Sequence, residues 1–92
     1  DINGQRYMLT GPVTIIGRGS ESDIIVDDSG VSRRHLEIRL TAGHTVATDL
    51  GSTNGTFVEG VRMDAATLVN GNTITIGHTT IMFWDGSDEV SG

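Results

Sequence analysis

The sequence predicts an all-β fold, an antiparallel β-sandwich built from roughly ten short strands. Short segments rich in β-branched residues, such as VTII at residues 13–16 and TITI at residues 73–76, favour strands. Turn signals separate such segments about every 8–12 residues, and no stretch has the 3.6-residue periodicity of an amphipathic helix. Short strands with frequent turns are typical of a sandwich, in which the loops gather at two ends.

Each strand is predicted from an apolar run and from the turn residues that bound it. Residues 61–69 fit a short strand, a helical turn or coil equally well, and residues 85–92 are expected to form a frayed tail. The strands are predicted at residues 5–9, 13–16, 24–26, 36–40, 45–49, 56–58, 73–76 and 79–84.

One hairpin in the middle of the chain has a predictable register. Apolar and charged residues alternate over residues 36–40, and an Ala-Gly turn follows shortly after. If Leu40 lies opposite Thr45, antiparallel pairing places Leu36 opposite Asp49. The segments just before the first strand and just after the second are therefore expected to emerge at the same end of the sandwich.

Composition narrows the classes of function. The chain of 92 residues is interpreted as one domain, residues 1–92, and as a module of a larger protein. Its net charge of −6 argues against nucleic-acid and anionic-membrane binding, although all six basic residues are arginine. No apolar run reaches the roughly 20 residues that span a bilayer, so no membrane insertion is expected. The absence of cysteine excludes a disulfide or thiol metal site and is compatible with a cytoplasmic location. No cofactor and no metal are expected.

Three short polar motifs occur in a fixed order. They are Gly17-Arg18, Ser32-x-x-His35 and Ser52-x-Asn54-Gly55-Thr56. In this order and spacing they resemble the motifs of the forkhead-associated (FHA) domain, and the resemblance extends over about residues 6–84. One motif alone would be weak, whereas the ordered set is specific. The resemblance implies a β-sandwich of about eleven strands whose loops at one end recognise phosphothreonine peptides.

The residues of these loops have the chemistry that a phosphate ester requires. A phosphothreonine carries a charge of about −1.5 to −2 and three strong acceptor oxygens. Arginine supplies charge-assisted, forked hydrogen bonds, and hydroxyls add short donors. The resemblance implies that Asn54 pairs with the main chain of the peptide. The expected phosphopeptide-binding residues are Arg18, Ser32, Arg33, Thr53 and Asn54.

Other residues are expected to support these loops or to select the peptide sequence. The resemblance implies that His35 fixes the loops by hydrogen bonds without touching phosphate, and glycine permits backbone angles closed to other residues. The residues alone do not decide between Arg33 and Arg34 as the phosphate ligand, and the family pattern favours Arg33, directly after the serine. Loop support is assigned to Gly17, His35, Ser52 and Gly55, and possible specificity to Arg34 and Arg62.

Two other functions were weighed. Ser32, Ser52, His35 and Asp49 share the rim, yet no Gly-x-Ser-x-Gly elbow is present, so the protein is predicted not to be an enzyme. The alternative is a scaffold that binds an unphosphorylated partner through a sheet face. The favoured partner is a threonine-phosphorylated segment, made by a Ser/Thr kinase in another protein or in the same polypeptide.

Two further expectations concern charged side chains outside the motifs. The acidic pair Asp27-Asp28 is predicted to be solvated surface, without the alternating ligand spacing of a calcium loop. His44 and His78 are expected to be exposed in hairpin turns.

Overall fold

The structure, a computed structural model, describes Ile2, Tyr7, Leu9 and residues 11–84 of the chain. In this part of the chain every regular element is a β-strand. The strands are β1 (Val13–Gly17), β2 (Ile24–Ile25), β3 (Leu36–Thr41), β4 (His44–Asp49), β5 (Thr56–Val58), β6 (Val61–Met63), β7 (Ala65–Leu68), β8 (Thr73–Ile76) and β9 (Thr79–Met82).

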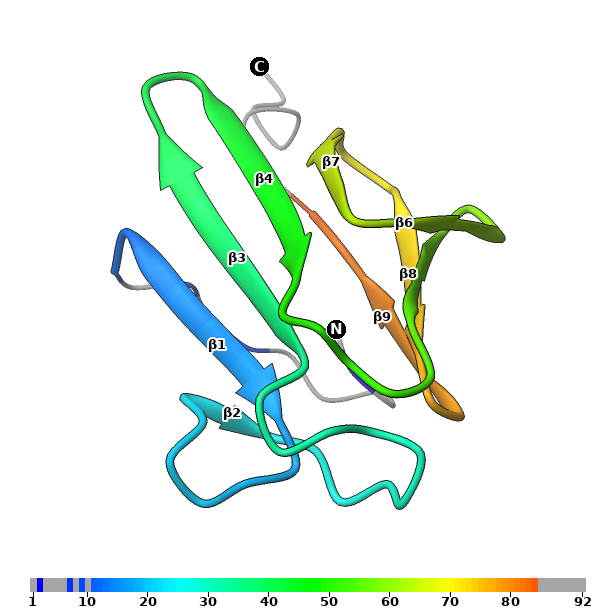
Figure 1. The fold of residues 1–92 in the computed structure, drawn as a ribbon. Helices are drawn as coiled ribbons and strands as arrows, with labels where there is room; N and C mark the ends of the chain where they lie inside the picture. The colour runs from blue at the N-terminus through cyan, green and yellow to red at the C-terminus, as the bar shows by residue number, and fades with distance from the viewer. Residues whose placement is uncertain (1, 3–6, 8, 10, 85–92) are drawn as a thin grey trace.

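The strands form two sheets, which confirms the predicted sandwich (Figure 1). One sheet has five strands in the order β2-β1-β3-β4-β7, and the other has four in the order β6-β5-β8-β9. The described residues thus contain nine strands where the family resemblance implied eleven. Most of the strand predicted at residues 5–9 and all of the predicted tail at 85–92 lie outside the described residues, and the described Tyr7 and Leu9 are not in a strand.

The predicted hairpin register is confirmed. Strands β3 and β4 pair with Leu40 opposite Thr45 and Leu36 opposite Asp49. Leu36 and Ile38 point into the core, with exposed fractions of 0% and 4%. Burial of this apolar face fixes the register, because a slip by one residue would turn every core side chain toward solvent.

Two features of the topology were not predicted from the sequence. The pairing of β1 with β2 is parallel, with Ile16 opposite Ile24, although the strands are joined only by the short loop 18–23. Residues 61–69, which were ambiguous, form β6 and β7 in different sheets, so the chain changes sheets at Asp64. The carbonyl of Asp64 accepts a hydrogen bond from the amide of Asp49 at 2.8 Å, which holds this crossing against the end of β4.

The apolar core lies between the two sheets, and the polar residues of the motifs lie in the loops outside it. Ile74 and Ile76 of β8 are buried and alternate with half-buried threonines, as expected for a strand with one face in the core. The loops between β1 and β2 (18–23), between β2 and β3 (26–35) and between β4 and β5 (50–55) lie along the lower edge of the view in Figure 1. These three loops are called the loop end below, and all three sequence motifs are at or within them.

Candidate functional site

Backbone hydrogen bonds join the three loops of the loop end. The amide of Arg18 donates to the carbonyl of Ser32 at 2.9 Å, and the amide of Gly19 donates to the carbonyl of Arg33 at 3.0 Å. The amide of Thr53 donates to the hydroxyl oxygen of Ser32 at 3.1 Å. Ser32 therefore lies between the other two loops and is tied to both.

Gly17 is required because two backbones approach closely at the end of β1. A β-carbon added at Gly17 would lie 2.2 Å from the carbonyl oxygen of Arg33 and 2.8 Å from its carbonyl carbon. No side chain fits there, since backbone atoms cannot move aside as the end of a flexible side chain can. The Gly-Arg motif thus brings Arg18 directly against the loop that carries Ser32 and Arg33.

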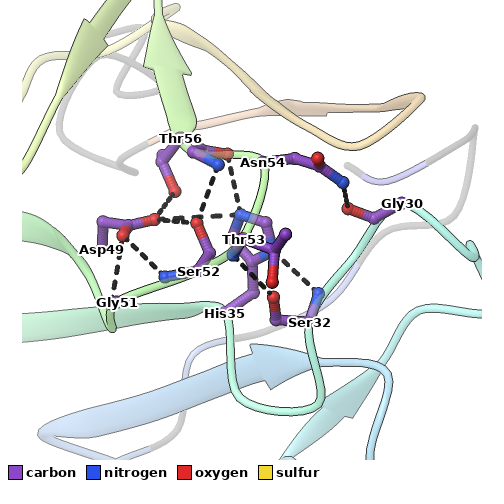
Figure 2. Close-up of polar contacts among 10 residues, drawn as sticks. Gly30, Ser32, His35, Asp49, Gly51, Ser52, Thr53, Asn54 and Thr56 are labelled. Atoms are coloured by element: carbon purple, nitrogen blue, oxygen red, sulfur yellow. Dashed lines mark hydrogen bonds and ion pairs between the residues drawn. The ribbon is translucent and has the colours of Figure 1, made fainter.

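His35 is fully buried, with an exposed fraction of 0%, and both ring nitrogens are hydrogen-bonded. Nδ1 accepts from the amide of Ser32 at 3.0 Å, and Nε2 lies 2.9 Å from the carbonyl oxygen of Gly55 (Figure 2). Because a carbonyl oxygen can only accept, Nε2 carries the proton and the ring is the neutral tautomer. The imidazole joins the β2–β3 loop to the β4–β5 loop beneath the surface, with no face available to a ligand.

Asp49, at the end of β4, is the centre of a hydrogen-bond network that organises the β4–β5 loop (Figure 2). Its Oδ1 accepts from the hydroxyls of Ser52 and Thr56 at 2.6 and 2.7 Å, and its Oδ2 accepts from the amides of Ser52 and Gly51 at 3.0 and 3.1 Å. Ser52 in turn accepts from the amide of Gly55 at 2.9 Å. Burial disfavours the charged carboxyl, but the hydrogen bonds from Ser52 and Thr56 outweigh it, so the pKa of Asp49 lies below its ordinary value.

From sequence, the chemistry weighed for Asp49 was that of a member of a catalytic triad. The geometry is that of a loop support instead: the Ser52 hydroxyl donates to Asp49 and His35 contacts the Gly55 carbonyl. The serine therefore has no base within the hydrogen-bond arrangement that a nucleophile needs. An aspartate followed by the hydroxyl and glycine residues of a tight turn was the available signal for this supporting role.

Asn54 and Thr53 are exposed at the tip of the β4–β5 loop. The Asn54 side chain reaches across to the β2–β3 loop, where its Nδ2 donates to the carbonyl of Gly30 at 2.9 Å (Figure 2). The second hydrogen on Nδ2 and the side-chain oxygen have no described partner. Asn54 is therefore fixed in position while it still presents a donor and an acceptor.

The arginines of the loop end differ in how they are held. Arg18 is exposed, and its Nε donates to the carbonyl of Val31 at 3.0 Å, while its two terminal nitrogens have no partner among the described residues. Arg33 forms an exposed ion pair with Glu21 at 3.4 Å. Arg34 is exposed and has no hydrogen bond or ion pair with another described residue.

Arg62, on β6, lies against the β4–β5 loop. A β-carbon added at Gly55 would lie 2.8 Å from the Nε of Arg62, so the guanidinium covers the glycine. Gly55 has a φ of 91°, a backbone conformation that favours glycine. The structure thus brings the predicted binding residues and their supports together at one end, with Arg62 beside them and Arg34 on the exposed part of the β2–β3 loop. The binding residues are Arg18, Ser32, Arg33, Thr53 and Asn54, and the supports are Gly17, His35, Ser52 and Gly55.

The expectation for the Asp27-Asp28 pair is wrong for Asp28. Asp27 is exposed, but the Asp28 side chain is only 9% exposed and accepts several hydrogen bonds from within the protein. Its donors include residues about fifty positions further along the chain, which no local pattern could reveal. His44 and His78 are exposed, as predicted.

Among the described residues, no group of three or more histidine and acidic side chains is arranged to hold a metal ion. That part of the chain also contains no helix long and apolar enough to cross a bilayer.

Comparison with known proteins identifies the family. The family model described as the FHA domain matches residues 14–77, which include all three motifs. The chain belongs to the FHA domain family. The match covers β1 except its first residue, β2 to β8 and every loop of the loop end, so the FHA assignment concerns the same residues that form the candidate site.

Two curated relatives of this FHA domain are bacterial regulators. The chain is 45% identical over 83 residues to the glycogen accumulation regulator GarA of Mycolicibacterium smegmatis, covering 90% of this chain and 52% of the relative. It is 42% identical over 86 residues to the oxoglutarate dehydrogenase inhibitor of Corynebacterium glutamicum, covering 94% of this chain and 60% of the relative. The chain thus spans between about half and three fifths of the length of these relatives.

Solved structures agree with the FHA assignment. The FhaA FHA domain, solved in complex with the intracellular domain of Rv3910, is 41% identical with a TM-score of 0.82, over 87% of this chain and 88% of that one. Mycobacterium tuberculosis EmbR, solved in complex with a low affinity phosphopeptide, is 37% identical with a TM-score of 0.86, over 89% of this chain and 22% of that one.

Proposed function

We propose that this FHA domain is a phosphothreonine-recognition module that mediates phosphorylation-dependent interactions between proteins in Ser/Thr kinase signalling. The observation that carries the proposal is the junction at Ser32, where the backbone of Arg18 and the amide of Thr53 both bond to one residue. Three segments distant in sequence therefore direct their polar groups to the same small area. The FHA domain of FhaA was solved in complex with a protein domain and EmbR in complex with a phosphopeptide, which supports the same class of ligand.

The phosphate is held by Arg18, Ser32 and Thr53 in this proposal. The terminal nitrogens of Arg18 supply charge-assisted hydrogen bonds, while its Nε remains on the carbonyl of Val31 and orients the guanidinium. Ser32 already accepts from the amide of Thr53, so its own hydrogen is available to donate to phosphate. The hydroxyl of Thr53, exposed beside it, adds a further donor.

Asn54 reads the main chain of the peptide. Its contact with the carbonyl of Gly30 fixes the amide plane before any ligand arrives. The remaining donor and acceptor match the alternating groups of an extended peptide backbone. This contact is independent of the peptide sequence, which suits a module whose anchor is the phosphate.

Arg33 is assigned a second contact with the phosphate. Its ion pair with Glu21 is exposed on both sides and 3.4 Å long. Surface pairs of this kind contribute only about 0–1 kcal/mol, so a doubly charged phosphate can displace Glu21. Arg34 and Arg62 are assigned to selection of the flanking sequence, with Arg62 held beside the Asn54-Gly55 turn and available to an acidic side chain of the peptide.

The proposed partner is a threonine-phosphorylated segment of another protein or of the parent polypeptide. A module that reads a kinase product must share the compartment of the kinase, and we assign it to the cytoplasm on this reasoning. The net charge of −6 makes long-range attraction of a phosphopeptide weak, so short-range contacts at the loop end dominate affinity.

The proposal is tested by titrating the whole chain with a phosphothreonine peptide selected from a library, and with the same peptide lacking phosphate. Binding is expected only with phosphate. Each hydrogen bond to a charged group contributes about 1.5–3 kcal/mol, so Arg18→Ala should weaken binding about tenfold or more in calorimetry. Arg39→Ala is the matched control, since Arg39 lies on β3 and pairs with Glu37 at 2.8 Å; its affinity should equal that of the wild type.

The same titration separates this function from the scaffold alternative. The half-buried Met82 ends β9 and the 53% exposed Trp84 follows it, and the alternative places an unphosphorylated partner on a sheet face that includes them. Binding that survives removal of the phosphate, or an Arg18→Ala variant with unchanged affinity, would refute phosphate recognition at the loop end.

A further inference from the structure

A cluster of hydrogen bonds behind the proposed phosphate site is centred on Asp28. Its Oδ1 accepts from the amide of Gly30 at 2.8 Å, and its Oδ2 accepts from the amide of His78 at 2.8 Å and the hydroxyl of Thr79 at 2.7 Å. The ring of the exposed His78 adds a longer contact at 3.4 Å. These four residues are called the Asp28 cluster below. The cluster joins the β2–β3 loop to the turn between β8 and β9, and therefore joins the two sheets.

The two segments that the cluster joins are packed without space for further atoms. A β-carbon added at Gly77 would lie 2.8 Å from the carbonyl carbon of Gly30, and one added at Gly30 would lie 3.0 Å from the α-carbon of Gly77. Val31, the next residue, is 1% exposed, and its amide donates to the carbonyl of Asp28 at 2.9 Å. The position of residues 28–31 is thus set by contact with the opposite sheet.

The backbone held by the cluster supplies the acceptors that orient the proposed ligand-binding side chains. The carbonyl of Gly30 accepts from Asn54, and the carbonyl of Val31 accepts from the Nε of Arg18. The next carbonyl, that of Ser32, accepts from the amide of Arg18. Three consecutive carbonyls therefore connect the cluster to both Arg18 and Asn54, from opposite sides of the site.

We infer that Asp28 is a positioning residue for phosphothreonine recognition, which sets the affinity by holding residues 30–32 against the β8–β9 turn. The inference rests on the proposed function. Asp28 does not touch the ligand, since its side chain is 9% exposed and its oxygens are occupied by the protein's own donors. Its effect is to keep the binding-competent loop populated before the ligand arrives, and apparent affinity falls in proportion to that population.

The test uses Asp28→Asn, which keeps the size of the side chain. Asp28→Ala is not used because it would leave several donors unpaired. Asparagine cannot accept at both positions, so one of the two contacts, to Gly30 or to His78 and Thr79, is lost. We expect Asp28→Asn to weaken binding of the phosphothreonine peptide about tenfold. Thr79→Val removes one donor and leaves the carboxylate, so this variant should also bind the peptide more weakly than the wild type, but by a smaller factor than Asp28→Asn. Asp27→Asn, at the exposed neighbouring position, should leave affinity unchanged.

Asp28 could affect binding only through the stability of the whole fold. This is separated from positioning of the loop by measuring affinity at a temperature at which every variant is folded. Circular dichroism identifies a temperature well below the unfolding transition of every variant, and calorimetry is performed there. A variant that melts earlier but binds within twofold of the wild type would overturn the inference, and a wild type that fails to bind phosphothreonine would instead refute the proposed function.

Amide hydrogen exchange provides a readout that needs no ligand. In Asp28→Asn, the amides of Arg18 and Val31 should exchange faster than in the wild type, because their acceptors belong to the released segment. In the wild type, bound peptide should slow exchange at the amide of His78. Peptide binding and the Asp28 cluster favour the same loop conformation, so each stabilises the other. Unchanged exchange at Arg18 and Val31 in Asp28→Asn would overturn the inference whether or not the peptide binds.

Discussion

Replacement of Asp49 gives the sharpest test of how the loop end is built. In Asp49→Ala the hydroxyls of Ser52 and Thr56 lose their acceptor, as do the amides of Gly51 and Ser52. Gly51 is exposed, so water replaces its partner, whereas the Thr56 residue is 0% exposed and has no such substitute. The loss falls mainly on the two hydroxyl contacts.

The expected magnitude follows from these contacts. Hydrogen bonds to charged groups contribute about 1.5–3 kcal/mol each, and the two hydroxyl contacts together give a loss of about 3 kcal/mol at the lower bound. For a domain of this size each 1 kcal/mol lowers Tm by about 4–8 °C. We therefore expect Asp49→Ala to lower Tm by roughly 12 °C or more.

Asp49→Asn should be milder and serves as an internal comparison. The amide oxygen can remain on the backbone amides of Gly51 and Ser52, while its NH₂ group faces the hydroxyls, which rotate to accept. We expect a loss of about 1 kcal/mol, because the contacts survive without the charge.

The assay is urea unfolding followed by circular dichroism, with Asp27→Asn as the control at an exposed acid. Surface substitutions usually change stability by less than about 0.5 kcal/mol, and the control should stay within that range. If Asp49→Ala cost less than about 1 kcal/mol, or no more than Asp49→Asn, the network around Asp49 would not be what organises the loop.

Two further predictions concern the backbone and the acid range. Gly17→Ala should destabilise the fold by about 1–3 kcal/mol, as overpacking does, because the added atom would lie 2.2 Å from the Arg33 carbonyl oxygen. The same variant should bind the peptide more weakly. Urea unfolding and peptide titration measure the two effects, and a variant unchanged in both would contradict the close approach. Hydrogen bonds from Thr79, Gly30 and His78 hold the pKa of Asp28 well below its ordinary range. Burial raises the pKa of Asp49, but hydrogen bonds from Ser52 and Thr56 outweigh this effect, so its pKa is also lowered. The unfolded carboxyls, with a pKa of about 3.9, bind protons first. Stability should therefore fall as the pH drops below about 4, and Asp49→Asn should make the acid limb of the stability curve less steep.

Much of the fold could be predicted because it depends on local patterns. The alternation that begins at Leu36 and the following turn determine the β3–β4 register, and that register delivers two of the three motifs to one end. The split of residues 61–69 into β6 and β7 could not be predicted, since no alternation marks it and the change of sheet occurs at the single residue Asp64. The parallel pairing of β1 and β2 is also unusual, because parallel strands commonly need a longer connection than residues 18–23.

In the candidate site, too, some residues could be predicted from local sequence and others depend on tertiary packing. Residue type and spacing pointed to Arg18 and Ser32 because phosphate chemistry requires such donors, and the expected role of Asn54 came from the family resemblance. The supports were harder to find from sequence. Asp28 depends on donors at residues 78 and 79, about fifty positions away, so its burial is set by how the sheets pack. Asp49 depends on neighbours within seven residues, and its role was open to interpretation from the turn chemistry alone.

The exposed arginines of the loop end have a consequence for how such a module can diversify. Arg34 and Arg62 contribute no side-chain hydrogen bond to the internal ties among the three loops of the described structure, whereas Ser32, His35 and Asn54 each contribute at least one. Substitutions at these two arginines can therefore change which sequences are accepted while the anchoring geometry stays intact. A new partner can be acquired, by natural drift or by engineering, without the protein having to fold in a new way.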